Sequence, residues 1–293
     1  MTSVHNLFRA AAFAMAVSLC APAAAGDGEA HLASVVQRLE TDLAARIGVL
    51  VTDSATRWKW GHRETERFLM ASTFKPVLCG AVLDRVDQGS LSLDERIEIR
   101  DDVMVAYAPV TETRLGGTMA VGELCLATLD LSDNTAANLL IDRLGGPQEV
   151  TAFLRRIGDE VTRLDRMEPD VNIFAPGDPR DTTSPAAILT TWEAMLRGPA
   201  LSTRSQATLA DWMGHGGVTQ ALIRAHVPAG WEVADKSGAG NGYTRGLVAM
   251  VTPPQRAPYF VAIYVSDTAA DFDARNAAVA DIAAAVVEVM RLR

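Results

Sequence analysis

The sequence predicts an α/β unit combined with an all-helical unit, in which one antiparallel sheet is built from both ends of the chain. Strand-like runs rich in β-branched and aromatic residues occur at 46–61 and again at 232–266. The long segment between them has helical periodicity, and the chain shows no internal repeat or long linker. The helical middle is therefore predicted to be an insertion, with a cleft where the two units meet.

The N-terminal segment of the chain is not predicted to belong to the folded protein. Residues 1–25 carry one charge, Arg9, followed by an apolar run and the small residues Ala23–Ala25, which is typical of a secretory signal peptide. The run is shorter than the roughly 20 apolar residues of a membrane span. We therefore expect cleavage, export to the bacterial periplasm and no membrane anchor.

A helix and two strands are predicted next. Apolar residues recur at helical spacing from Leu32 to Leu43, which predicts a helix over 31–45. The segments 46–53 and 56–61 are predicted to form two strands on either side of a short turn.

Six helices are predicted in the middle of the chain, at 72–87, 118–129, 134–144, 147–157, 184–197 and 202–213. Candidate N-cap residues are Thr118, Asn134 and Ser202. Pro147 and Pro185 fit first helical turns, and Gly145-Gly146 fits a helix end. The run 163–183 has neither helical nor strand periodicity and is predicted to be a loop. A loop of this length in a compact domain is usually functional.

The C-terminal part returns to the sheet. Strands are predicted at 232–239, 245–252 and 258–266, followed by a final helix at 273–291. We assign residues 26–62 and 214–293 to the α/β unit and residues 63–213 to the all-α unit.

The composition is that of an ordinary globular protein. Hydrophobic residues make up 48% and charged residues 22% of the 293 residues, which excludes disordered, collagen-like and coiled-coil classes. The net charge of −9 gives an acidic surface that repels phosphate backbones, so no nucleic-acid partner is expected. The histidines form no H-x-x-x-H or H-x-H pair, so no metal site is expected either.

A candidate nucleophile lies at the start of the first helix of the middle segment. Ser72 and Lys75 are three residues apart, so on a helix they share a face. A lysine kept neutral by desolvation can take the proton of the serine, and the helix N-terminus favours a developing oxyanion. Taken alone, the motif also fits a capping serine beside a surface lysine.

Two further polar motifs follow in order. Ser132-Asp133-Asn134 fits a turn with an N-cap, and Lys236-Ser237-Gly238 fits an edge strand protected by a lysine. Gly238 and Gly240 permit close approach to the backbone of that strand. These separate structural explanations do not account for the joint occurrence of the three motifs.

With S-x-x-K, S-D-N and K-S-G in this order, the chain resembles a class A serine β-lactamase. The resemblance covers about residues 30–291, and Ser237 keeps the hydroxyl of the usual threonine. It implies the serine β-lactamase/D,D-peptidase-like fold and hydrolysis of penicillin-type antibiotics through a serine acyl-enzyme, conferring resistance. It also implies β-lactams and mechanism-based inhibitors as ligands, no cofactor, and a monomer.

The segment 163–181 resembles the omega loop of this family. Glu168 and Asn172 match its E-x-x-x-N pair, and Arg166 and Asp181 match the ion pair that closes it. The residues themselves agree, because a cleft carboxylate can activate a water that a nearby amide orients. The Glu168–Pro169 bond is expected to be cis.

Smaller matches extend the resemblance. Tyr107 matches a tyrosine at the cleft edge, and Arg245 matches an arginine that binds the substrate carboxylate. Cys79 and Cys125 remain after signal cleavage, and two cysteines in an exported chain usually pair. They also match the disulfide of many penicillinase-type members, with two buried thiols as the alternative.

The resemblance implies a role for each site residue. Ser72 attacks the lactam carbonyl, Lys75 or Glu168 through a water takes its proton, and Ser132 relays a proton to the leaving nitrogen. The N–H groups of Ser72 and Ala239 form the oxyanion hole. The substrate-binding set is Tyr107, Asn134, Asn172, Lys236, Ser237, Ala239 and Arg245.

Two other functions share parts of this pattern. A D,D-peptidase, or penicillin-binding protein, has the three motifs without the Glu168 loop. A non-hydrolysing β-lactam sensor module is acylated without turnover and is expected to have a membrane tether. Ala106 and Gly240 favour a narrow, penicillinase-like spectrum for a hydrolase.

Overall fold

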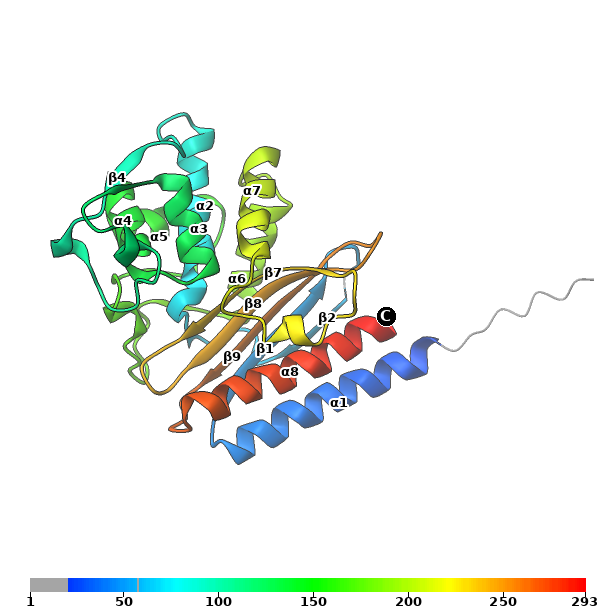
Figure 1. Ribbon diagram of the computed structural model, residues 1–293. Coiled ribbons are helices and arrows are strands. Elements are labelled where there is room, and N and C mark those ends of the chain that lie inside the picture. The colour runs from blue at the N-terminus through cyan, green and yellow to red at the C-terminus, as the bar shows by residue number, and fades with distance from the viewer. Residues whose placement is uncertain (1–20, 57) are drawn as a thin grey trace, which may run out of the picture.

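A five-stranded antiparallel sheet forms the centre of the molecule in this computed structural model, which describes residues 21–56 and 58–293 (Figure 1). The strand order is β2-β1-β9-β8-β7. The strands are β1 (Arg46–Asp53), β2 (Lys59–His62), β7 (Glu232–Ala239), β8 (Arg245–Thr252) and β9 (Tyr259–Ser266). The prediction that both chain ends build one sheet is confirmed, since β1 pairs with β9 along its whole length.

Two long helices cover one face of the sheet. α1 (Ala21–Asp42) and α8 (Phe272–Leu292) lie side by side along it in Figure 1. Their apolar faces, with Leu32 and Val286 among them, bury one core together with alternate strand residues such as Val49. α1 begins at Ala21, inside the predicted signal peptide, and residues 1–20 of that peptide lie outside the described residues.

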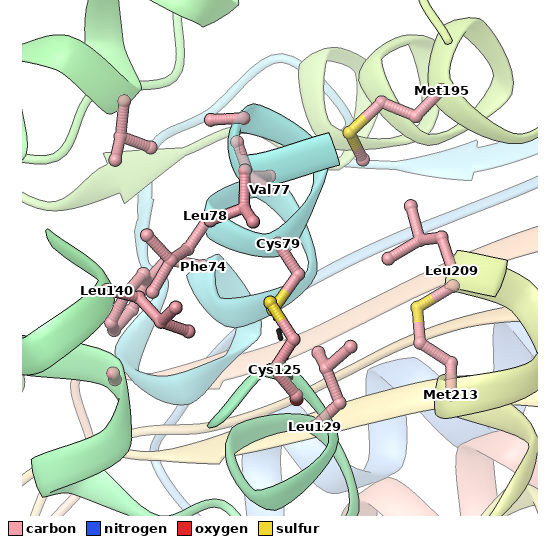
Figure 2. Packing of buried hydrophobic residues seen from close by; sticks show 14 of the residues in the cluster. Phe74, Val77, Leu78, Cys79, Cys125, Leu129, Leu140, Met195, Leu209 and Met213 are labelled. Atoms are coloured by element: carbon pink, nitrogen blue, oxygen red, sulfur yellow. Dashed lines mark hydrogen bonds between the residues drawn. The ribbon is translucent and has the colours of Figure 1, made fainter. Parts of the chain in front are cut away.

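The other face of the sheet carries the helices of the middle segment (Figure 1). They are α2 (Lys75–Asp87), α3 (Val121–Asp130), α4 (Asn134–Leu144), α5 (Pro147–Arg156), α6 (Pro185–Leu196) and α7 (Thr203–Gly214). Figure 2 shows part of their core around α2. Sheet residues such as Leu50 and Phe260 belong to the same core, so it is continuous between the two units. The division at residues 62 and 213 stays a prediction.

Short elements that the periodicity does not predict join these layers. β3 (Phe68–Leu69) pairs with β6 (Thr182–Thr183), and β4 (Arg96–Glu98) pairs with β5 (Thr118–Ala120). Single 3₁₀ turns are η1 (Ala71–Phe74), η2 (Asp101–Val103), η3 (Thr111–Arg114), η4 (Asp170–Asn172) and η5 (Ile223–Ala225). Segments of two to four residues are too short for a periodic signal.

The helix ends agree with the sequence in most places. Ser202 caps α7 by accepting from the Ser205 N–H, and Gly145 ends α4 with a φ of 107°. Two predicted caps are wrong. Thr118 lies in β5, and α4 is capped by Asp133, which accepts from the Ala136 N–H, rather than by Asn134. Any of the residues in Ser132-Asp133-Asn134 can cap, so composition alone did not distinguish among them.

The two cysteines of the helical unit are adjacent but not bonded. Cys79 on α2 faces Cys125 on α3 in Figure 2, and both are free thiols. Cys79 Sγ donates to the Cys125 carbonyl oxygen over 3.9 Å, so the predicted disulfide is absent from this structure. Burial raises the pKa of the Cys79 thiol well above its ordinary value, and a disulfide forms from a thiolate and needs an oxidant. The pairing in exported protein stays a prediction.

None of the helices of the described residues combines the length and the apolar character that spanning a bilayer requires.

Candidate active site

The three sequence motifs and the omega loop meet at one cleft of about 340 Å³ between the sheet and the helical unit. Eight predicted site residues line it: Ser72, Tyr107, Ser132, Asn134, Asn172, Ser237, Ala239 and Arg245. Val218, Gly238 and Phe272 complete the wall. Lys75, Lys236 and Glu168 are buried beside the lining residues.

Ser72 lies in the turn η1, and Thr73 and Phe74 connect it to α2, which begins at Lys75. The Lys75 N–H donates to the Ser72 carbonyl oxygen, so the turn leads directly into the helix. Ala71 has a φ of 43°, a left-handed conformation that costs a non-glycine residue about 1–3 kcal/mol. The strained residue is therefore next to the candidate nucleophile.

Gly238 permits β7 to pass close to this turn. A Cβ atom on Gly238 would lie 2.6 Å from the Met70 carbonyl oxygen and 2.9 Å from the Ser72 nitrogen. The close approach predicted at Gly238 is thus an approach to the backbone of the turn that carries Ser72, whereas Gly240 lies against Thr244, Leu69 and Asn172. It places Ser237 and Ala239 beside Ser72 in the cleft.

Lys75 is a fully buried cation bound by several acceptors. Its Nζ donates to the Ser132 carbonyl oxygen at 2.8 Å and to Asn134 Oδ1 at 2.7 Å. It also lies 3.3 Å from Glu168 Oε1. Burial lowers the pKa of Lys75, and the neighbouring Glu168 carboxylate opposes that shift. The lysine is therefore easier to deprotonate than one in water.

The hydroxyl of Ser132 connects two buried lysines. Ser132 Oγ accepts from Lys75 Nζ at 3.2 Å and from Lys236 Nζ at 3.0 Å. Burial lowers the pKa of Lys236 well below its ordinary value, and the nearby charge of Lys75 adds to that effect. A serine bound in this way can pass a proton between the two sides of the cleft.

Asp133, in the middle of the second motif, has a supporting role that the sequence did not reveal. Its buried carboxylate accepts from the N–H groups of Val110 and Thr111, both at 2.9 Å. The backbone of this loop is also held by the Asn134 N–H, which donates to the Tyr107 carbonyl oxygen at 3.0 Å. The second motif thus holds the loop that places Tyr107, 59% exposed, at the cleft edge.

Glu168 is held in the omega loop by two asparagines. The Asn138 side chain donates to the Glu168 carbonyl oxygen at 2.8 Å and accepts from its N–H at 2.9 Å. Asn172 Nδ2 donates to Glu168 Oε2 at 2.5 Å. Within the described residues, Glu168 Oε1 and Asn172 Oδ1 are buried without a hydrogen-bond partner. The predicted cis bond at Glu168–Pro169 is confirmed.

Asn138 was not recognised as part of the site from the sequence. It lies one helical turn after Asn134 on α4, and this i,i+4 spacing was the available signal.

The two ends of the omega loop are closed by a buried ion pair. Arg166 Nε lies 2.5 Å from Asp181 Oδ2, and Asp181 also accepts from the N–H groups of Asp165 and Arg166. Burial raises the pKa of Asp181, and its hydrogen bonds and the Arg166 charge act against that shift. The predicted contact between Arg166 and Asp181 is confirmed.

Arg245 is presented to the cleft from β8, as expected. Its guanidinium donates to the Gly238 carbonyl oxygen at 3.0 Å and to Asn276 Oδ1 at 3.0 and 3.1 Å. Burial, with the charge of Arg275, lowers the pKa of Arg245 to about 10. Asn276, on α8, is a second positioning residue that the sequence did not reveal, because it is 31 residues from Arg245.

The chain is similar to known proteins of one family. A family model described as "Beta-lactamase enzyme family" matches residues 31–290. A curated protein from Rhodobacter capsulatus named "Beta-lactamase" is 49% identical over 282 residues, covering 96% of each chain.

Solved structures of β-lactamases have the same fold. A β-lactamase from Xanthomonas campestris pv. campestris is 43% identical, with a TM-score of 0.87 over 90% of this chain and 98% of that one. An ancestral class A β-lactamase is 49% identical, with a TM-score of 0.85 over 88% and 99% of the two chains.

Proposed function

The chain belongs to the class A β-lactamases and hydrolyses β-lactams, and we propose that it does so through an acyl-enzyme on Ser72. The proposal is supported by the cleft, which Ser72 lines together with the Gly238 segment, and by the buried Lys75, whose N–H donates to the Ser72 carbonyl oxygen. The N–H groups of Ser72 and Ala239 form the oxyanion hole, where each donor contributes roughly 10²–10³ in rate.

Proton transfer in acylation has two routes. Lys75, made less basic by burial, takes the Ser72 proton directly, or Glu168 takes it through a water. Ser132 then delivers a proton to the lactam nitrogen, since its hydroxyl contacts both Lys75 and Lys236. Lys75, the first of these groups, lies 3.2 Å from Ser132 Oγ and 3.3 Å from Glu168 Oε1.

Substrate binding is divided between the two walls of the cleft. Lys236, Ser237 and Arg245 bind the carboxylate of the substrate, with the Arg245 fork fixed by Asn276. Asn134 contacts the acylamide group, and Tyr107 covers it from the cleft edge.

Hydrolysis of the acyl-enzyme depends on Glu168, and the surroundings of its side chain are the observation that carries the proposal. Among the described residues, Glu168 Oε1 and Asn172 Oδ1 are buried acceptors without a hydrogen-bond partner, with the Lys75 ammonium 3.3 Å from Glu168 Oε1, and they suit a bound water. Glu168 as general base then activates this water for attack on the ester. A D,D-peptidase lacks the Glu168 loop, and a non-hydrolysing sensor is acylated without turnover.

Mass spectrometry after mixing with benzylpenicillin tests these roles. Glu168→Ala is expected to accumulate an acyl-enzyme adduct, because acylation through Lys75 continues while the water is no longer activated. Ser72→Ala is expected to show no adduct. Turnover of Glu168→Ala at the parent rate contradicts the role of Glu168, and an adduct on Ser72→Ala moves the nucleophile elsewhere.

The setting of the reaction is part of the proposal. The signal-like segment 1–25 supports export to the periplasm, where penicillins reach their targets and hydrolysis confers resistance. Mechanism-based inhibitors that acylate Ser72 are expected ligands, no cofactor is required, and the enzyme acts as a monomer. N-terminal sequencing of periplasmic protein tests the cleavage after Ala25.

A further inference from the structure

Phe272, the first residue of α8, is an apolar cleft residue to which the proposed mechanism gives no role. Its side chain lines the cleft, is 50% exposed and belongs to neither apolar core of the described residues. Tyr107, the other aromatic lining residue, lies on the loop that Asn134 holds. A large apolar side chain that is half-exposed in the wall of a binding site suits contact with an apolar group of a ligand.

The ring of Phe272 lies against the guanidinium of Arg245. The Arg245 Cζ atom is 5.3 Å from the ring centroid, which is within the range of a cation–π contact. Asn276, one helical turn further along α8, accepts from Arg245 Nε at 3.1 Å and from Nη2 at 3.0 Å. Phe272 and Asn276 thus share one side of the helix, and both contact the residue that is proposed to bind the substrate carboxylate. The ring therefore marks the carboxylate end of the cleft.

The start of α8 is held in place, so the backbone that carries this ring is fixed. Asp271 caps the helix by accepting from the Ala274 N–H at 2.8 Å. The buried Arg275 donates to the Thr244 carbonyl oxygen at 2.9 Å, which ties the helix to the residue before Arg245. A surface that is already ordered loses little conformational freedom when a ligand binds to it.

The chemistry of the substrate indicates which group meets the ring. In penicillins and cephalosporins, the ring carbon next to the carboxylate-bearing carbon carries substituents, which are two methyl groups in penicillins and a variable group in cephalosporins. When Arg245 binds the carboxylate, this neighbouring substituent is only a few bonds from the guanidinium and so lies beside Phe272. A planar heteroaromatic substituent gains most there, because aromatic pairs attract each other beyond the area that they bury. A cationic substituent is disfavoured by the nearby Arg245 charge.

We propose that Phe272 is a specificity-determining residue that forms an aromatic platform for the substituent next to the substrate carboxylate. The platform favours cephalosporins in which this substituent carries a neutral heteroaromatic ring. The ring of Phe272 also contacts the Arg245 guanidinium, whose N–H groups Asn276 accepts. The inference rests on the proposed function, in which Arg245 binds the carboxylate of a substrate that acylates Ser72.

Steady-state kinetics on two cephalosporins test the platform. The two share one acyl side chain and differ only in the substituent next to the carboxylate, which is a methyl group in one and a neutral heteroarylthiomethyl group in the other. Phe272→Ala removes the ring, while Phe272→Tyr keeps it. Asn276→Ala is the matched control, because it removes a contact to Arg245 from the same helix and leaves the ring in place. The difference in intrinsic reactivity cancels, since every variant is tested on the same pair.

We expect Phe272→Ala to lower kcat/KM for the heteroaryl cephalosporin about tenfold relative to the methyl cephalosporin, mostly through a higher KM. Phe272→Tyr should keep the parent ratio of the two kcat/KM values. Asn276→Ala should lower both values by the same factor, because the carboxylate is common to both substrates. Thermal unfolding checks that each variant is folded, and Phe272→Leu replaces Phe272→Ala if that variant is not.

Three results overturn the platform. The first is the parent ratio in the folded Phe272→Ala enzyme, since an equal loss on both substrates means that the ring only orients Arg245. The second is the same loss of ratio in Phe272→Tyr, and the third is a lowered ratio in Asn276→Ala. Failure of the proposed function is distinguishable, because benzylpenicillin hydrolysis would then survive Ser72→Ala whatever the ratio.

Discussion

Gly238 offers the sharpest test of the geometry at the nucleophile. In Gly238→Ala, the new Cβ would lie 2.6 Å from the Met70 carbonyl oxygen, 2.9 Å from the Ser72 nitrogen and 3.0 Å from the Thr73 nitrogen. All three neighbours are backbone atoms, so no side-chain rotation relieves the contact. Restoring an ordinary separation of 3.4 Å from the Met70 oxygen requires a displacement of about 0.8 Å between β7 and the turn.

That displacement is expected to act on catalysis because the proposed oxyanion hole spans the two elements. The Ser72 N–H lies on the turn and the Ala239 N–H follows Gly238 on β7. Loss of one oxyanion donor costs roughly 10²–10³ in kcat, and misplacement by about 1 Å costs roughly 10²-fold. We expect kcat/KM for benzylpenicillin to fall at least about 100-fold, which corresponds to roughly 2.7 kcal/mol of transition-state stabilisation.

The assay compares two glycine-to-alanine variants by the loss of β-lactam absorbance. Gly214→Ala is the matched control, because a Cβ at Gly214, the last residue of α7, meets nothing within 4 Å. The control should keep the parent rate, and thermal unfolding should show that both variants are folded. A folded Gly238→Ala enzyme with parent kcat/KM would refute the reasoning.

Three further outcomes are expected. Arg166→Ser removes the cation that pairs with the buried Asp181 carboxylate, so benzylpenicillin deacylation should slow by up to about 100-fold. Stopped-flow measurement of acyl-enzyme decay tests this, and an unchanged decay rate contradicts the role of the Arg166–Asp181 ion pair in holding the omega loop. Cys79 and Cys125 should form a disulfide in periplasmic protein, shown by non-reducing peptide mapping, and two alkylatable thiols contradict it. Because burial lowers the pKa of Lys236 in the folded protein, the unfolded chain binds that proton more tightly, so the free energy of unfolding should rise with pH towards 10.5. Urea titrations at several pH values should show that the free energy of unfolding rises less steeply with pH in Lys236→Met than in the parent protein. An equal pH dependence in both proteins would contradict Lys236 as the cause of the rise.

The sequence predicted the fold to within a few residues at most element ends. Strands β7, β8 and β9 begin and end within one residue of their predicted ranges, and α4 matches its range. These elements are long enough to show a period, and their ends carry proline and glycine signals whose effect is local. The pairs β3–β6 and β4–β5 were not predicted, because strands of two or three residues are formed by their partners.

The candidate site was predicted as a set of residues, but its geometry was not. The sequence alone did not predict that Ser72, Lys75, Ser132 and Lys236 lie close together. That prediction came from the resemblance of their motifs to those of a known family. Asn138 and Asn276 were missed, since each acts on a group 30 or 31 residues away in the chain. Contacts of that separation depend on how helices and strands pack, which local sequence does not specify.

By itself, the sequence determined the secondary structure, the layers of the fold and the residue types available for chemistry, because periodicity, caps and turns are local properties of the chain. Only the tertiary structure decided what those residues can do. It buried Lys75 and Lys236 and so lowered the pKa of each, and it brought Gly238 against the nucleophile turn. It also placed Phe272 against Arg245 in the wall of the cleft. Desolvation and close approach depend on every segment that surrounds a group, and those segments come from distant parts of the chain.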